Sequence, residues 1–142
     1  MPGMEPASRY TELRRQEAAS PKVLFAVDAI GPPDSVVHDL DKLTATAPGA
    51  VAAGGGHVLE ISHVVFPNGA ITLVLVLAES HLSIHTWPEE NMVAIDLFSC
   101  GAIDGRLVID HLVRDLRLTS VTVRDLPRGV PRPAPRDVPS PT

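Results

Sequence analysis

The sequence predicts an α+β fold, with a mixed or antiparallel sheet that carries two helices on one face. Six short segments of this 142-residue chain are rich in aliphatic and β-branched residues, and two others repeat apolar residues at helical spacing. Their order is β-α-β-β-β-β-α-β, which is typical of a two-layer sandwich. Segment 70–78, "AITLVLVLA", is apolar on both faces of a strand. We therefore expect a second copy of the chain to cover the face that the helices leave open, in a dimer with facing sheets.

The first half of the chain contributes three strands and one helix. "KVLFAVDAI" (22–30) predicts a strand that "GPPD" ends, with Asp34 as the N-cap of a helix. "PGAVAAGGG" (48–56) predicts a flexible loop. Segments 57–66 and 70–78 predict two strands that the turn signal "PNG" (67–69) joins into a hairpin. The helix that Asp34 would cap presents four residues at helical spacing: Val36, Val37, Leu40 and Leu43.

The second half completes the sheet and adds the second helix. Residues 82–87 favour extended chain, and "MVAIDLFSC" (92–100) is another largely apolar strand. "RLVIDHLVRDL" (106–116) predicts an amphipathic helix, and "LTSVTVRDL" (118–126) alternates as a last strand. The apolar face of that helix consists of Ile109, Leu112, Val113 and Leu116.

Composition excludes several classes of protein. The net charge of −5 and the pI of about 5.6 argue against a nucleic-acid partner, which would require a basic face. No apolar run reaches the roughly 18–20 residues that cross a bilayer, so no membrane association is expected. The N-terminal sequence lacks the apolar core of a signal peptide, and a cytoplasmic location is expected.

The chain has room for one domain. We assign 1–20 as a flexible N-terminal segment, 21–125 as a single α+β domain and the proline-rich stretch 126–142 as a disordered tail.

Residues 78–90, "AESHLSIHTWPEE", gather the groups that carry chemistry. A metal site could use His81 and His85, which share a face in a strand, together with Glu79. A serine hydrolase could use Ser80 and His85, but no G-x-S-x-G motif is present and an unbroken strand points the two to opposite faces. A third reading is self-cleavage between Glu79 and Ser80. The residues alone leave all three open.

"ESHLSIHTWPE" followed by "AIDLFSCG" resembles the S-adenosylmethionine decarboxylase proenzyme family, in its bacterial short form. The offsets from Ser80 to His85 and from Ser80 to Cys100 match that family's pattern. The resemblance is close over 75–101 and looser over 22–125. It implies an enzyme without a metal that cleaves itself between Glu79 and Ser80, giving chains 1–79 and 80–142.

The resemblance also implies how the chain would be processed. Ser80 Oγ would attack the carbonyl of Glu79 and convert the amide to an ester. Thr72 occupies the position of a supporting hydroxyl, and His85 would remove the Cα proton of Ser80 as the processing base. The product is a pyruvoyl group derived from Ser80, which would be the covalent cofactor and would form a Schiff base with the substrate amine.

Three further residues match functional positions of that family, and a fourth departs from the family's usual sequence. Cys100 would be the proton donor, Phe66 the residue that stacks on adenine, and Glu89 the contact to the ribose. Glu90 opens the stretch Glu90-Asn91-Met92, where the family usually has Tyr-Gly-Tyr. A carboxylate there is suited to the side-chain cation of a basic amino acid.

The resemblance therefore implies a carboxy-lyase that converts S-adenosylmethionine to its decarboxylated form for spermidine biosynthesis. The altered stretch keeps open a pyruvoyl-dependent ornithine or arginine decarboxylase. An uncleaved, non-catalytic dimeric binding module is the third possibility.

Overall fold

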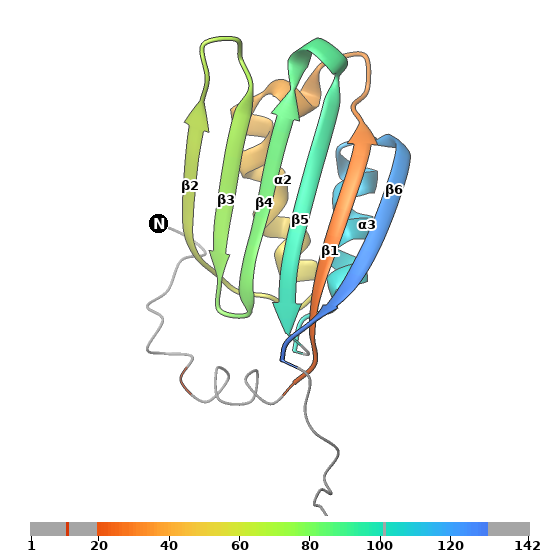
Figure 1. Cartoon of the computed structure of the whole chain (residues 1–142). Helices are drawn as coiled ribbons and strands as arrows, with labels where there is room; N and C mark the ends of the chain where they lie inside the picture. Colours follow the sequence, from red (N-terminus) through yellow and green to blue (C-terminus); the bar gives the residue numbers. More distant parts are fainter. Residues whose placement is uncertain (1–10, 12–19, 101, 131–142) are drawn as a thin grey trace, which may run out of the picture.

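The computed structural model describes Thr11 and residues 20–100 and 102–130 as a two-layer α+β sandwich (Figure 1). All strand pairs are antiparallel, in the order β2-β3-β4-β5-β1-β6, and helices α2 and α3 cover one face of the sheet. The predicted fold class and element order are confirmed. The elements are β1 (Lys22–Ile30), η2 (Val36–His38), α2 (Leu40–Ala53), β2 (Val58–Val65), β3 (Ile71–Leu77), β4 (Ser80–Trp87), η3 (Pro88–Glu90), β5 (Met92–Cys100), α3 (Gly105–Asp115) and β6 (Thr119–Arg128).

The predicted start of the first helix is wrong. Residues 36–38 form a separate 3-10 turn, and α2 begins at Leu40 with Asp39 as its N-cap. The Asp39 carboxylate accepts hydrogen bonds from the amides of Asp41 and Lys42. Asp34 instead accepts a hydrogen bond from the Val36 amide and pairs with Arg117. Both aspartates suit an N-cap by residue type, and the structure uses Asp39.

The predicted loop 48–56 is also wrong in its first part, because α2 continues to Ala53 and contains Pro48. An internal proline costs a helix about 3 kcal/mol, which is why the sequence favours a break there. The helix continues because residues on both sides of Pro48 pack into the core. Leu43, Ala47, Ala50 and Val51 are fully buried at helical spacing.

The last strand runs to Arg128, past the end expected at 126. It therefore takes the first residues of the predicted proline-rich tail into the sheet. Pro127 is tolerated there because β6 is an edge strand, the position in a sheet to which proline is largely confined. The rest of the predicted tail, from 131, and nearly all of the predicted N-terminal segment lie outside the described residues.

Burial alternates along the strands and separates two faces of the sheet. Ile71, Leu73, Leu75 and Leu77 of β3 are buried beneath the helices, as are Leu82, Ile84 and Thr86 of β4. The opposite face, here called the open face, carries the intervening residues. Within one chain it faces solvent, and Val76 on it is 40% exposed. The predicted cover by a second copy stays a prediction. Neither α2 nor α3 has the length and apolarity to cross a bilayer.

Candidate active site

The predicted catalytic residues lie in two groups at opposite ends of the sheet. Ser80 begins β4 and Cys100 ends β5, so the two meet at the end where the β3–β4 turn lies (Figure 1). This is called the junction end. His85 lies five residues further along β4, which corresponds to about 16 Å at the rise of a strand. The end that holds the β2–β3 turn and η3 is called the far end.

Ser80 has a backbone that strands do not normally adopt. Its φ of 145° lies in the region that favours glycine. Such a conformation costs a non-glycine residue about 1–3 kcal/mol and is found mainly at functional sites. Ser80 is half-buried, and its Oγ lies 4.0 Å from Sγ of Cys100, which is 7% exposed. The structure thus places two of the three predicted catalytic residues side by side, next to a strained peptide.

Glu79, on the other side of the predicted cleavage point, is fully buried. Its Oε1 accepts a hydrogen bond of 2.9 Å from the backbone amide of His57, and its Oε2 lies 2.7 Å from His57 Nδ1. A buried carboxylate is costly unless it is paired and hydrogen-bonded, and His57 meets both conditions. Glu79 is therefore held firmly at the start of the strained link.

Thr72 and His85 form the second group. They are direct cross-strand partners on β3 and β4, and Thr72 Oγ1 lies 3.2 Å from His85 Nδ1. Both are half-buried on the open face, and the His85 ring packs at a tilt against Trp87 with centroids 6.4 Å apart. The Thr72 hydroxyl and the His85 imidazole are therefore held as a pair. Within one chain this pair is not in contact with Ser80.

The predicted substrate-binding residues also lie at the far end. Phe66 follows β2 and is 45% exposed, and Glu89 and Glu90 are exposed in the turn η3. Glu89 Oε2 accepts a hydrogen bond of 2.7 Å from Asn68 Nδ2. Its own backbone amide, and then Asn68, lower the pKa of the Glu89 carboxyl below its usual value, so Glu89 is ionised at neutral pH.

The altered stretch after Trp87 turns the chain at this end. Asn91 adopts a left-handed backbone with φ of 48°, which Asn tolerates better than most residues. Its side-chain amide donates to the carbonyls of Gly31 and Pro32, and its Oδ1 lies 2.8 Å from His38 Nε2. Asn91 therefore joins η3 to the end of β1, and Glu90 is the member of the stretch that is exposed to solvent.

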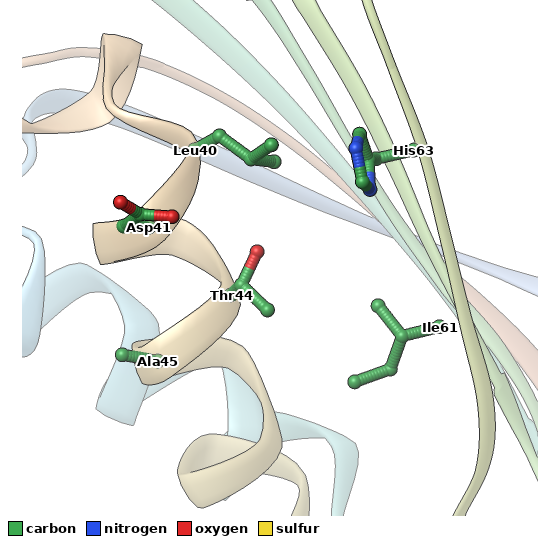
Figure 2. Close-up of a pocket in the computed structure, with 6 residues that line it drawn as sticks. All are labelled: Leu40, Asp41, Thr44, Ala45, Ile61 and His63. Carbon is green, nitrogen blue, oxygen red and sulfur yellow. The ribbon is translucent and has the colours of Figure 1, made fainter. Parts of the chain in front are cut away.

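Three cavities border these elements, and two of them adjoin the junction end. One of about 230 Å³ is lined by residues that include Cys100 and Ser99, and one of about 380 Å³ on the open face is lined by Leu24, His81, Ser83, Asp96, Phe98 and Arg128. The third, of about 460 Å³, lies between α2 and β2, where Leu40 and Thr44 face Ile61 and His63 (Figure 2). No predicted catalytic residue lines the third cavity.

The metal-site and serine-hydrolase interpretations of residues 78–90 do not fit the arrangement of these side chains. The carboxylate of Glu79 is bound to His57 and does not join His81 and His85. Within the described part of the chain, no three His, Cys, Asp or Glu side chains lie close enough to hold a metal ion. Ser80 and His85 are too far apart along β4 for a nucleophile–base pair in one chain.

Sequence reasoning missed His57. Its contact with Glu79 spans 22 residues of sequence, and no local pattern marks it. The available signal was an acidic residue at the end of the apolar run 70–78, because a carboxylate buried there needs a partner from elsewhere.

Comparison with known proteins gives one consistent result. Residues 24–129 match the family model described as S-adenosylmethionine decarboxylase. The chain is 37% identical over 105 residues to S-adenosylmethionine decarboxylase proenzyme 2 of Bacillus anthracis, covering 73% of this chain and 85% of that protein. It is 39% identical over 107 residues to the S-adenosylmethionine decarboxylase proenzyme of Brevibacillus brevis, covering 74% and 80%.

A solved structure shares the fold. The adenosylmethionine decarboxylase from Aquifex aeolicus superposes with a TM-score of 0.68 at 23% identity, covering 80% of this chain and 94% of that chain. The match of the family model and the identity to these relatives agree with the resemblance that the motif around Ser80 indicates. The chain belongs to the S-adenosylmethionine decarboxylase family, which is a family of carboxy-lyases.

Proposed function

We propose that this protein cleaves itself between Glu79 and Ser80 and becomes a pyruvoyl-dependent decarboxylase of S-adenosylmethionine, serving spermidine biosynthesis. The observation that carries the proposal is the backbone of Ser80. A strained serine stands at the family's motif position, with a buried glutamate before it and the Cys100 thiol 4.0 Å from its hydroxyl. Strain in the peptide to be broken is released on cleavage, which favours the reaction.

The chain's own residues account for each step of processing. Ser80 Oγ bonds to the carbonyl carbon of Glu79, the C–N bond breaks, and the hydroxyl proton ends on the freed nitrogen. The resulting ester is a better leaving group than a hydroxyl, and His85 removes the Cα proton of Ser80 while the Cβ–Oγ bond breaks. The main-chain carboxylate of Glu79 leaves and becomes the new C-terminus of chain 1–79. The dehydroalanine that remains tautomerises and hydrolyses, with loss of ammonia, to a pyruvoyl group at the head of chain 80–142.

Because His85 lies about 16 Å from Ser80 within one chain, a second chain completes the site in this proposal. A two-fold axis between two open faces, running across the strands, places the junction end of each chain opposite the far end of its partner. The partner's Thr72 and the partner's His85 then face Ser80 and Cys100. One such dimer holds two identical sites, and it covers the apolar residues of the open face.

The residues around Ser80 also fit the mature reaction. The pyruvoyl ketone supplies an electron sink for loss of carbon dioxide from an amine-bearing acid. Cys100 would supply the proton for the substrate α-carbon, because a thiol beside the reacting group can act as a general acid. The partner's Phe66 offers an exposed ring to adenine, and the partner's Glu89 offers an ionised acceptor to the ribose hydroxyls.

A second substrate class has one observation in its favour. Glu90 places an exposed carboxylate at the far end, next to Glu89 in η3. Two neighbouring acids would suit the side-chain cation of ornithine or arginine, and the two aromatic residues that the family usually has in this stretch are absent. S-adenosylmethionine remains the first choice, because the relatives reported above carry it in their names.

The test uses purified full-length protein and its Ser80→Ala variant. Denaturing electrophoresis and mass spectrometry are expected to show two fragments, of residues 1–79 and 80–142, in the wild type and one 15.1 kDa chain in the variant. Release of carbon dioxide is then compared for S-adenosylmethionine, ornithine and arginine. An intact wild-type chain without carbon dioxide release from any of the three would contradict the proposal and favour a non-catalytic binding module.

A further inference from the structure

The turn between β3 and β4 is buried, which is unusual for a two-residue hairpin connection. Ala78 and Glu79 form this turn, and both have no exposed surface. Connecting segments normally lie at the surface, because buried backbone leaves polar groups without water. This turn obtains its partners from the segment just before β2, and the partner residue is His57.

His57 makes three hydrogen-bonding contacts to the two turn residues. Its carbonyl oxygen accepts from the Ala78 amide at 2.9 Å, its amide donates to Glu79 Oε1 at 2.9 Å, and its Nδ1 lies 2.7 Å from Glu79 Oε2. An ionised carboxylate can only accept, so Nδ1 carries the proton in this contact. Both carboxylate oxygens and the backbone on the other side of the turn are therefore held by one residue.

The fit around this contact is tight. A Cβ on Gly56 would lie 2.7 Å from side-chain atoms of Val51 and Ile103 and 3.3 Å from Glu79 Oε1. The loop that carries His57 is thus pressed against the Glu79 carboxylate. The His57 side chain itself is 44% exposed, so the imidazole reaches from solvent to a fully buried acid.

We propose that His57 is a positioning residue for self-cleavage, which fixes the Glu79 side of the scissile peptide while Ser80 holds the strained side. This inference rests on the proposed self-cleavage and adds to it a residue outside the Ser80, His85 and Cys100 set. Holding the Glu79 side chain fixes the direction of its carbonyl, so that Ser80 Oγ can approach the carbonyl carbon.

Charge gives His57 a second role in the same step. When Ser80 Oγ bonds to the carbonyl carbon, negative charge develops on the carbonyl oxygen of Glu79. The carboxylate of the same residue would repel that charge if it were free to approach. Two donors from His57 keep the carboxylate on the β2 side and partly neutralise it, which lowers the cost of the acyl shift.

Cell-free translation provides the experiment, because cleavage can be followed from the moment the precursor is made. His57→Ala removes the Nδ1 donor and is expected to slow cleavage about tenfold or more, the effect of losing one hydrogen bond to a charged group. His57→Asn places an amide donor near the position of Nδ1 and is expected to recover most of the rate. His63→Ala is the matched control, an exposed histidine in β2, the strand that follows His57. It lines the cavity in Figure 2.

Two further measurements separate positioning from folding. Hydroxylamine cleaves an accumulated ester, so a chain that is slow in the acyl shift is expected to stay intact in hydroxylamine. The unfolding temperature of His57→Ala is measured in a Ser80→Ala background, where no cleavage interferes. A slow but cooperatively folded His57→Ala chain that resists hydroxylamine supports the inference.

Cleavage of His57→Ala at the wild-type rate would overturn the inference and leave the proposed function intact. The inference would also be overturned if His57→Ala abolished cleavage but the variant no longer unfolded cooperatively, because the loss would then be a folding defect. Failure of the wild type itself to cleave would instead contradict the proposed function.

Discussion

The two ends of the sheet differ in backbone, burial and hydrogen bonding. At the junction end, Ser80 has a strained backbone, and its neighbours Glu79 and Cys100 are buried. At the far end, Thr72 and His85 lie in regular strand, half-buried and bonded to each other. The reactive bond and the groups proposed to act on it are therefore kept apart in one chain. Under the proposed function, assembly of two chains, and not folding alone, would bring the reacting groups together.

Under the proposed self-cleavage, this separation has a physical advantage. Strain and burial are built by the fold of one protomer, where the core fixes them. The acid–base pair needs partial exposure, so that its imidazole can exchange a proton. Placing the two on opposite ends of one sheet lets each end keep the environment that it requires.

The largest expected effect tests the separation directly. His85→Ala is expected to slow release of the ester by about 10²–10⁴-fold, the usual contribution of a general base. The chain should then accumulate as an ester that hydroxylamine cleaves, which electrophoresis detects. This outcome differs from that of His57→Ala, which is expected to leave no ester.

Mixing of variants then locates the base. Ser80→Ala and His85→Ala chains are each expected to remain uncleaved alone. Co-refolded, they should give mixed dimers in which the His85→Ala chain is cut, because its Ser80 faces an intact histidine of the partner. Absence of cleavage in the mixture, with dimers verified by light scattering, would place the whole site within one chain.

Cys100 is expected to affect turnover more than processing. Cys100→Ala should lower carbon dioxide release per pyruvoyl group by about 10²-fold or more, because the proton donor is lost. Cys100→Ser keeps the size of the side chain but not the acidity of a thiol, so it should resemble Cys100→Ala. A Cys100→Ser enzyme with wild-type turnover would show that the acidity of a thiol is not required at this position.

The strain at the junction end predicts a smaller effect, on stability. Glycine in place of alanine normally costs a strand about 0.5–1 kcal/mol, but relief of strain at a φ of 145° is worth about 1–3 kcal/mol. Ser80→Gly should therefore be more stable than Ser80→Ala by roughly 1 kcal/mol in denaturant unfolding. The matched pair Ser83→Gly and Ser83→Ala, in a Ser80→Ala background, should show the opposite order, because Ser83 lies in regular strand.

The smallest expected effect concerns a surface ion pair beside the far end. Arg117 lowers the pKa of the Asp34 carboxyl, mainly through a hydrogen bond, so the pair contributes stability above the ordinary aspartate pKa. That contribution is lost as pH falls through the lowered value. A double-mutant cycle of Asp34→Asn and Arg117→Gln should show weak coupling at pH 7 that declines towards pH 3. Coupling that grows on acidification would contradict the assignment.

Local patterns predicted the elements well where hydrophobic period and turn residues agree. The strand Lys22–Ile30 begins and ends as expected, and "PNG" joins two antiparallel strands. The errors lie where local signals compete. Asp34 and Asp39 are both suited to cap a helix, and Pro48 marks a break that core packing overrides. The choice in both cases depends on contacts with residues distant in sequence.

The order of elements and the alternation of burial follow from the sequence, because periodicity is a local property. The proposal that Ser80, His85 and Cys100 react rests on the resemblance of their motif to that of a known family. The tertiary structure alone decided that Ser80 is strained, that His57 holds the buried Glu79, and that His85 lies at the other end of the sheet from Ser80. These depend on how strands pair across the sheet. Strand pairing is a long-range property, set by the burial of whole faces and not by any short stretch of residues.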